Sequence, residues 1–148
     1  MSTYHYTESG LANVYIEGLV PFKDDDGDEV IHIPAINELH HAIAQGIVCH
    51  DKGMSPAELR FLRTEMGLTQ TELAQMVHRD KQAVGRWERG EFPMDGVIET
   101  VVRRLAIERL ELENVPGGIE KLAKSSVHSS EIQPININHS KGNYALAA

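Results

Sequence analysis

The fold is decided by residues 67–90, which read GLTQTELAQMVHRDKQAVGRWERG. This pattern predicts two short helices joined by a tight turn near His78. Thr69 has the hydroxyl of a capping residue, and Glu72 stands three residues later, where it completes a capping box for the first helix. Asp80 can cap the second helix through its carboxylate. The stretch therefore predicts a pair of helices that begin and end at defined residues.

The two predicted helices each have a buried face and an exposed face. Leu73, Met76 and Val77 are expected to point inward from the first helix, and Val84 and Trp87 from the second. Gly90 then ends the second helix in the left-handed conformation. The outer face of the second helix is predicted to carry Lys81, Gln82, Gly85 and Arg86.

This outer face is suited to the major groove of DNA. A helix of about two turns can enter the groove when a partner helix holds it at a steep angle. Arginine pairs with guanine and glutamine with adenine, and each bidentate contact contributes roughly 1–3 kcal/mol of discrimination. Gln70 lies near a helix N-terminus, where it can donate to a phosphate. The candidate DNA-binding residues are Thr69, Gln70, Arg79, Lys81, Gln82, Gly85, Arg86 and Arg89.

Each of these residues also has a plainer interpretation. Lys81, Gln82 and Arg86 could form the exposed face of a helical protein that binds no DNA. Arg79 and Arg89 could contact phosphates or only solubilise the surface. Because the whole motif is present, we expect DNA contact.

At these residues the chain resembles the Xre family of Cro- and phage-repressor-like helix-turn-helix regulators. The likeness lies in residues 68–70, 73–74 and 84–90, although His78 stands where a turn glycine is common and Gly85 replaces a frequent serine. The resemblance implies a four- or five-helix DNA-binding domain.

Two flanking segments resemble a subgroup of this family, the antitoxins of the MqsA and HigA type. The segments are residues 6–15 and 58–63. The resemblance implies a small N-terminal domain that binds a toxin protein, often a ribonuclease that cleaves mRNA, and repression of the protein's own operon by dimers. The better-known members hold zinc through N-terminal cysteines. Cys49 is the single cysteine here, so the resemblance carries over neither the zinc nor the toxin.

Three regions are predicted along the chain. Residues 1–53 form a small α+β N-terminal domain, residues 54–113 the helix-turn-helix domain, and residues 114–148 a C-terminal tail. In the first region, residues 13–20 and 29–33 are rich in β-branched side chains and flank an Asp-Gly turn, which predicts a hairpin.

Further elements are predicted on both sides of the central motif. Apolar residues recur at helical spacing over residues 36–48. Residues 55–58, Ser-Pro-Ala-Glu, start another helix with a capping box, and Gly67 ends it. Residues 95–112 carry a wide apolar stripe, expected in part to close the core and in part to form a dimer seam. Residues 131–138 alternate like a strand that packs on the N-terminal hairpin. The fold class is therefore mostly α within α+β.

The net charge of −8 is unevenly distributed. Residues 1–53 hold nine acidic and two basic side chains, whereas residues 54–113 hold eleven acidic and nine basic. Phosphate binding favours a basic surface, and the basic residues lie where DNA contact is predicted. A dimer can therefore present a locally positive face. The acidic first region would suit a basic partner, although most acidic segments are only solvated surface.

Several other classes of protein lack their signatures here. We expect no enzyme and no cofactor, because no glycine-rich phosphate loop, paired carboxylates or Cys/His arrangement stands out. We expect no metal, because a closed zinc site needs four converging ligands and the cluster His40, His41, Cys49 and His50 does not converge on a helix.

The location expected from the sequence is the cytoplasm, with no membrane contact. No apolar run is long enough to span a bilayer, and the first residues lack the basic and apolar regions of a signal peptide. A single cysteine also suits a reducing compartment.

Two hypotheses of function follow. The first is a dimeric repressor of a palindromic double-stranded operator, read by Lys81, Gln82 and Arg86. The second is an antitoxin whose main role is to neutralise a toxin through its N-terminal region, with operator binding secondary. Both can hold for one protein.

Overall fold

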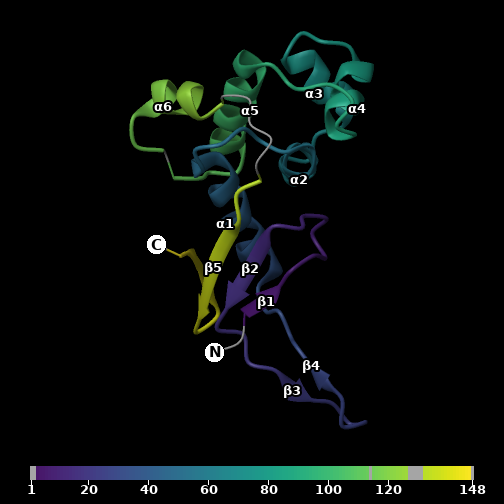
Figure 1. Cartoon of the computed structure of the whole chain (residues 1–148), viewed down its shortest axis with the longest axis vertical. Coiled ribbons are helices and arrows are strands. Elements are labelled where there is room, and N and C mark those ends of the chain that lie inside the picture. The colour runs from purple at the N-terminus through teal and green to yellow at the C-terminus, as the bar shows by residue number, and fades with distance from the viewer. Residues whose placement is uncertain (1–2, 114, 127–131, 148) are drawn as a thin grey trace.

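The computed structural model describes residues 3–113, 115–126 and 132–147. A group of helices forms one end of the molecule, a small sheet backed by a helix forms the middle, and a short hairpin projects at the other end (Figure 1). The predicted α+β class, with strands at both ends of the chain around a helical centre, is confirmed.

Within the described residues the helices follow one another through the middle of the chain. The segment that follows Gly117 was not predicted as a helix, because Pro116, Gly117 and Gly118 indicate a break in the chain. Gly117 and Gly118 do have positive φ angles, as a break in the chain predicts, but a helix already starts at Gly118. The helices are α1 (Ile36–Cys49), α2 (Pro56–Glu65), α3 (Gln70–Met76), α4 (Lys81–Glu88), α5 (Gly96–Arg109) and α6 (Gly118–Ser125).

The start of α2 follows its local sequence. The Ser55 hydroxyl accepts a hydrogen bond from the Glu58 amide, and the Glu58 carboxylate accepts one from the Ser55 amide. This is the predicted capping box. Gly67 follows the helix with a φ of 73°, in the left-handed region predicted for the residue that ends it.

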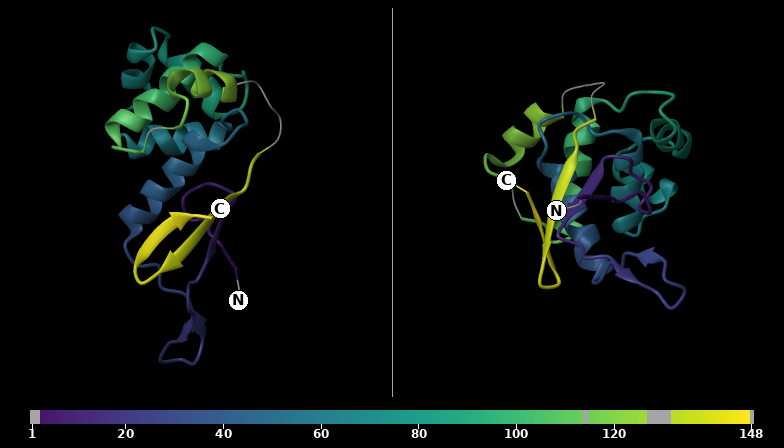
Figure 2. Two further views of the ribbon diagram at one scale, coloured as in Figure 1. Left: turned by 90° about the vertical axis from the view of Figure 1, so that its left-hand side faces the viewer. Right: turned by 60° about the horizontal axis from the view of Figure 1, so that its bottom comes forward.

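A four-stranded sheet joins the two ends of the chain (Figure 2). Its central strands, β2 and β5, run parallel and place Val14 opposite Ile135 and Ile16 opposite Ile137. All four of these side chains are buried. In spatial order the strands are β1 (Thr3–His5), β2 (Val14–Glu17), β5 (Ile135–Ser140) and β6 (Asn143–Leu146).

The N-terminal hairpin differs from the prediction. The Asp-Gly turn does connect an antiparallel pair, but its strands are only β3 (Phe22–Lys23) and β4 (Glu29–Val30). The predicted pairing of residues 13–20 with residues 29–33 is therefore wrong. The physical reason is that β2 buries its apolar side chains in the main sheet, between β1 and β5, which a pairing across the local turn would not provide.

Helix α1 covers one face of the sheet. Its side chains Leu39, Ile43 and Ile47 have no exposed surface. Gly46 allows the helix to approach closely, because a Cβ at this position would lie 2.9 Å from Cγ2 of Ile135. The predicted helix over residues 36–48 is thus part of the β-rich half of the molecule.

A buried polar network connects the sheet to α2. Glu58 lies at its centre, and the Asn13 amide nitrogen donates both to Glu58, at 3.3 Å, and to the Gln133 carbonyl, at 2.7 Å. His50 Nε2 lies 3.4 Å from the same carboxylate. Burial by itself would raise the pKa of Glu58. The hydrogen bond and charge of His50, with donors from Ser55 and Asn13, outweigh it, so the pKa lies below its usual value.

Arg103 of α5 is the most deeply buried charged residue of the core, with 0% of its surface exposed. It forms an ion pair with Glu99 one turn earlier, at 3.1 Å. Its guanidinium also donates to backbone carbonyls at the C-terminal ends of α1 and α6, which a helix leaves without partners, and to one in the segment after α1. The accepting carbonyls are those of Val48 at 3.2 Å, His50 at 3.1 Å, Lys52 at 2.6 Å and Ser125 at 3.5 Å.

Some apolar side chains expected inside are exposed. Met76 was predicted to face inward, but it lies in solvent because α3 buries the face of Leu73 and Ala74. The apolar stripe predicted over residues 95–112 is only partly buried in α5. Val102 is buried, whereas Val101 beside it is exposed.

We predict that Arg103→Met destabilises the protein by about 3–5 kcal/mol, because it leaves the buried Glu99 carboxylate without its cation and several carbonyls without donors. The free energy of unfolding would be measured by urea denaturation. The control is Arg104→Met, which removes an exposed ion pair with Glu108 and should cost about 1 kcal/mol or less. Equal losses in the two variants would show that Arg103 does not hold the elements together.

Candidate nucleic-acid interface

Local hydrogen bonds set the ends of α3 and α4. The Thr69 hydroxyl accepts from the Glu72 amide at 3.1 Å, and the Glu72 carboxylate accepts from the Thr69 amide at 3.0 Å. The Asp80 carboxylate accepts from the Ala83 amide at 2.8 Å. Both predicted caps are confirmed. Between the helices, His78 has a φ of 57°, a conformation that glycine adopts at lower cost.

The inner faces of the two helices pack into the core. Val84 and Trp87 of α4 are buried, as predicted, and so are Leu73 and Ala74 of α3. Because Val84 and Trp87 fix the rotation of α4 about its own axis, the opposite side of the helix faces solvent.

That outer side carries three of the predicted base-reading residues. Lys81, Gln82 and Arg86 are all exposed. They project from a helix of eight residues, which is about two turns. Long side chains with several hydrogen-bond donors on one face of so short a helix can reach the edges of bases in a major groove.

Two further arginines flank this face. Arg79 lies before α4 and pairs with Asp95, with 3.5 Å between nitrogen and oxygen. Arg89 lies after it and pairs with Glu91. Both ion pairs are exposed and therefore contribute little to stability. Both guanidinium groups can exchange their carboxylates for phosphate oxygens at small cost.

The loop after α4 brings an aromatic ring to the same face. Phe92 is 56% exposed, and the Arg86 guanidinium carbon lies 5.7 Å from the centre of its ring. A shallow hollow between α4 and this loop is bordered by both side chains and by Trp87 and Pro93. Phe92 was not among the predicted site residues, although an aromatic residue two positions after a helix-ending glycine was visible in the sequence.

Two predicted site residues are less exposed than expected. Gln70 is half-buried, and its amide nitrogen donates to Glu88 at 3.1 Å. Gly85 is buried, so its predicted place on the outer face is wrong. Side chains fold over it: a Cβ there would lie 3.0 Å from an Arg89 guanidinium nitrogen and 3.7 Å from the Gln70 amide oxygen. Glycine at this position makes room for Arg89.

A half-buried ion pair that the sequence interpretation missed holds α2 against α4. Arg63 donates to both carboxylate oxygens of Glu88, at 2.5 and 3.0 Å, and to the Leu68 carbonyl at 2.9 Å. Because Glu88 also accepts from Gln70, one carboxylate fixes three helices relative to one another. The sequence did contain one signal for this pair, which is that Glu88 is an isolated acidic residue between Trp87 and Arg89 in the predicted recognition helix.

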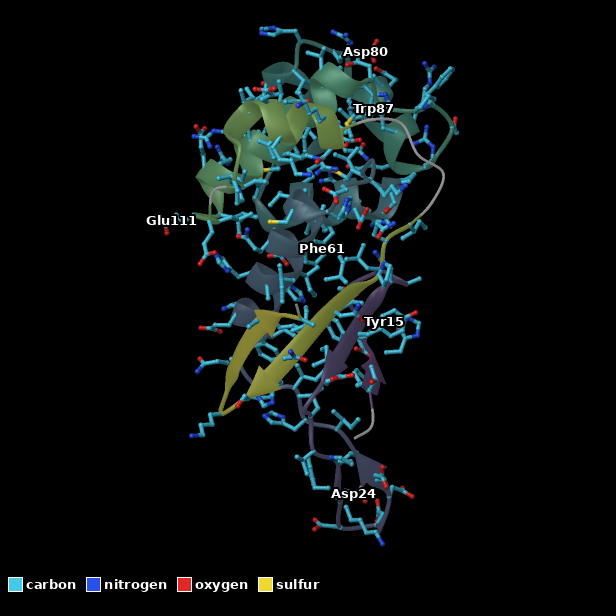
Figure 3. The ribbon with its side chains drawn as sticks, turned by 60° about the vertical axis from the view of Figure 1, so that its left-hand side comes forward. Tyr15, Asp24, Phe61, Asp80, Trp87 and Glu111 are labelled. Carbon is cyan, nitrogen blue, oxygen red and sulfur yellow. The ribbon has the colours of Figure 1, made fainter. Side chains whose placement is uncertain are left out.

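The acidic hairpin lies far from this face. Figure 3 shows Asp24 at one end of the molecule and Asp80 at the other. Carboxylate oxygens of Asp24, Asp26 and Asp28 lie within 4.8 Å of one another and are exposed. Asp24 accepts from the amides of Asp26 and Asp28, which is a turn-forming arrangement. The negative charge therefore does not oppose phosphate binding at α4.

We predict that Glu88→Ala lowers the free energy of unfolding by about 3 kcal/mol, because it leaves the largely covered Arg63 guanidinium without its carboxylate partner. Urea denaturation would measure the loss. The control, Glu91→Ala, removes the exposed pair with Arg89 and should cost about 1 kcal/mol or less. A similar small loss for Glu88→Ala would contradict the role assigned to this pair.

Comparison with known proteins identifies the same segment. Residues 59–112, which run from within α2 to just past α5, match the family model described as helix-turn-helix. No curated protein and no solved structure matches the chain. Among the described residues, no helix has the length and apolar character needed to cross a membrane. The matched segment has the helix caps, the buried rear face and the exposed polar front described above. The match shows that the chain contains a helix-turn-helix domain, the DNA-binding module of transcription regulators.

Proposed function

We propose that the protein is a sequence-specific repressor that binds a palindromic operator as a dimer and places α4 in the major groove. The observation that carries this proposal is the exposed row of Lys81, Gln82 and Arg86, on a short helix whose rear is anchored by Val84 and Trp87. A helix that is fixed on one side and rich in donors on the other is what direct readout requires.

The exposed side chains take different roles in this proposal. Arg86 and Lys81 suit the acceptors of guanine, and Gln82 suits adenine, which offers both a donor and an acceptor. Arg79 and Arg89 take phosphates on either side of the groove. Thr69 and Gln70, at the N-terminus of α3, position the backbone of the operator, and Gly85 leaves space for the Arg89 side chain.

A second copy of the chain is part of the proposal. One helix of eight residues reaches only a few base pairs, so useful specificity needs two half-sites about one helical turn apart. Val97 and Val101 are exposed one turn apart on α5 and supply an apolar seam. Two copies that meet at this seam would each contribute one α4 to the two half-sites.

The proposal is tested by selecting bound fragments from random DNA with the full-length protein. We expect a palindromic site, and we expect Arg86→Ala to lower the affinity for that site by about 1–3 kcal/mol, or roughly five- to 150-fold. Binding to a scrambled sequence should change little. Fluorescence anisotropy at two salt concentrations separates base readout from phosphate contact.

The matched control is Lys124→Ala, which removes one exposed positive charge from α6. It should leave specific binding unchanged. If Arg86→Ala keeps its full preference for the selected site at moderate salt, α4 is not the element that reads the bases.

The projecting hairpin favours a second candidate function, toxin neutralisation. Val20 is 80% exposed and Phe22 is half-exposed, beside an acidic turn. A two-stranded hairpin is marginally stable by itself in water, so a partner that covers the apolar side chains would stabilise it. A basic protein would complement the charge.

For this candidate we predict that the full-length protein co-purifies with the product of an adjacent small reading frame and that Phe22→Ser weakens the association at least tenfold. The loss has a physical basis, because an exposed aromatic ring is a common anchor of protein interfaces. Co-expression followed by pull-down would measure it. Phe92→Ser serves as the control, and an equal effect of both substitutions would argue against the hairpin as the binding site.

A further inference from the structure

We propose that Phe92 is a positioning residue that holds the Arg86 guanidinium in the orientation needed to read guanine. This inference rests on the proposed function and adds a specificity-determining residue outside the recognition helix. The geometry behind it is the Arg86 side chain lying over the Phe92 ring, 5.7 Å from its centre, at the edge of the exposed face of α4.

The first step of the argument is that the ring is held in place. The Glu91 amide donates to the Arg86 carbonyl at 2.9 Å, so the loop is tied to the backbone of the arginine itself. Gly90, with a φ of 74°, turns the chain at this point. Pro93 then restricts the backbone directly after Phe92. These restraints hold the backbone of Phe92, so the ring extends from a defined point beside Arg86.

The loop is fixed at its far end as well. Asp95 caps α5 by accepting from the Ile98 amide at 2.9 Å, and it pairs with Arg79 at 3.5 Å. The segment that carries Phe92 is therefore bounded by hydrogen bonds on both sides.

The second step concerns the donors of the guanidinium group. An aromatic ring attracts the flat face of this group, whereas the N–H donors point outward in its plane. Contact with the Phe92 ring uses no hydrogen-bond acceptor, so the N–H donors of Arg86 stay available for O6 and N7 of guanine. Arg79 and Arg89 lie instead beside Asp95 and Glu91, carboxylates that compete for the donors themselves.

The third step is the exposure of the ring. Phe92 is more than half exposed although it belongs to the loop that closes the domain. The ring is therefore not mainly a core residue, and its contact with Arg86 gives it a different role. Because its exposure is high, substitution should alter the orientation of Arg86 without unfolding the protein.

The experiment uses the full-length protein and the operator obtained by fragment selection. Each guanine is replaced in turn by 7-deazaguanine, which lacks the N7 acceptor. We expect the unmodified protein to lose affinity at the guanine of each half-site that Arg86 contacts. Phe92→Leu should lower specific affinity by about two- to fivefold and should shrink the 7-deazaguanine penalty at that guanine.

Two further variants separate positioning from a general loss of structure. Phe92→Tyr keeps an aromatic face and should restore both the affinity and the penalty. Phe22→Leu makes the same change at an exposed phenylalanine in β3 and should have no effect on DNA binding. The salt dependence of binding should stay the same in all variants, because no phosphate contact is removed.

The outcomes are distinguishable. An unchanged 7-deazaguanine penalty in Phe92→Leu would overturn the inference while leaving the repressor proposal intact. Replacing thymine by uracil removes the thymine methyl group. If this replacement weakens binding of the unmodified protein but not of Phe92→Leu, the ring contacts that methyl group directly, and the positioning role is wrong. Absence of any preferred sequence for the unmodified protein would overturn both proposals.

Discussion

The buried guanidinium of Arg103 is the interaction on which the arrangement of the molecule depends. Arg103 lies on α5. It donates hydrogen bonds to carbonyls at the end of α1, in the segment that leads to α2, and at the end of α6. A single side chain thus satisfies carbonyl groups that would otherwise be buried without donors. Its own charge is balanced by Glu99, which also accepts from the Met54 amide. The β-rich half and the helical half are therefore joined by polar contacts inside the core, where geometry is restrictive.

In the helical half, a second arginine likewise joins several elements through an ion pair and hydrogen bonds. Arg63 and Glu88 form a half-buried pair that places α2, α3 and α4 at fixed angles, with Gln70 added to the same carboxylate. Apolar packing by Val84 and Trp87 determines which side of α4 faces inward. The pair determines how the helices cross. Both are needed before the exposed donors of α4 can be aimed at a rigid target such as a base pair, because a small error in angle is amplified along a long side chain.

Local features of the fold could be predicted from the sequence. Among the long-range features, a C-terminal strand beside the N-terminal strands was predicted, but its parallel pairing with β2 was not. The caps at Thr69 and Asp80 follow from hydrogen bonds within one helical turn, which a sequence displays directly. The pairing of β2 with β5 depends on residues more than a hundred positions apart, and nothing in the turn at Asp24 reveals it. Likewise, the exposed face of α4 followed from helical periodicity. The contacts of Arg63 and Phe92, and the covering of Gly85, arise from neighbours in space and needed the structure.

The parallel pairing of β2 with β5 also imposes an order of events during synthesis. Helices α2 and α3 both contact α4 within residues 56–88, so these three helices can form while the chain is still growing on the ribosome. The central sheet has to wait for residues 135–140, because β2 has no partner on its inner side until they emerge. Contacts between distant segments form slowly. A nascent chain can therefore form α4 before its central sheet can close.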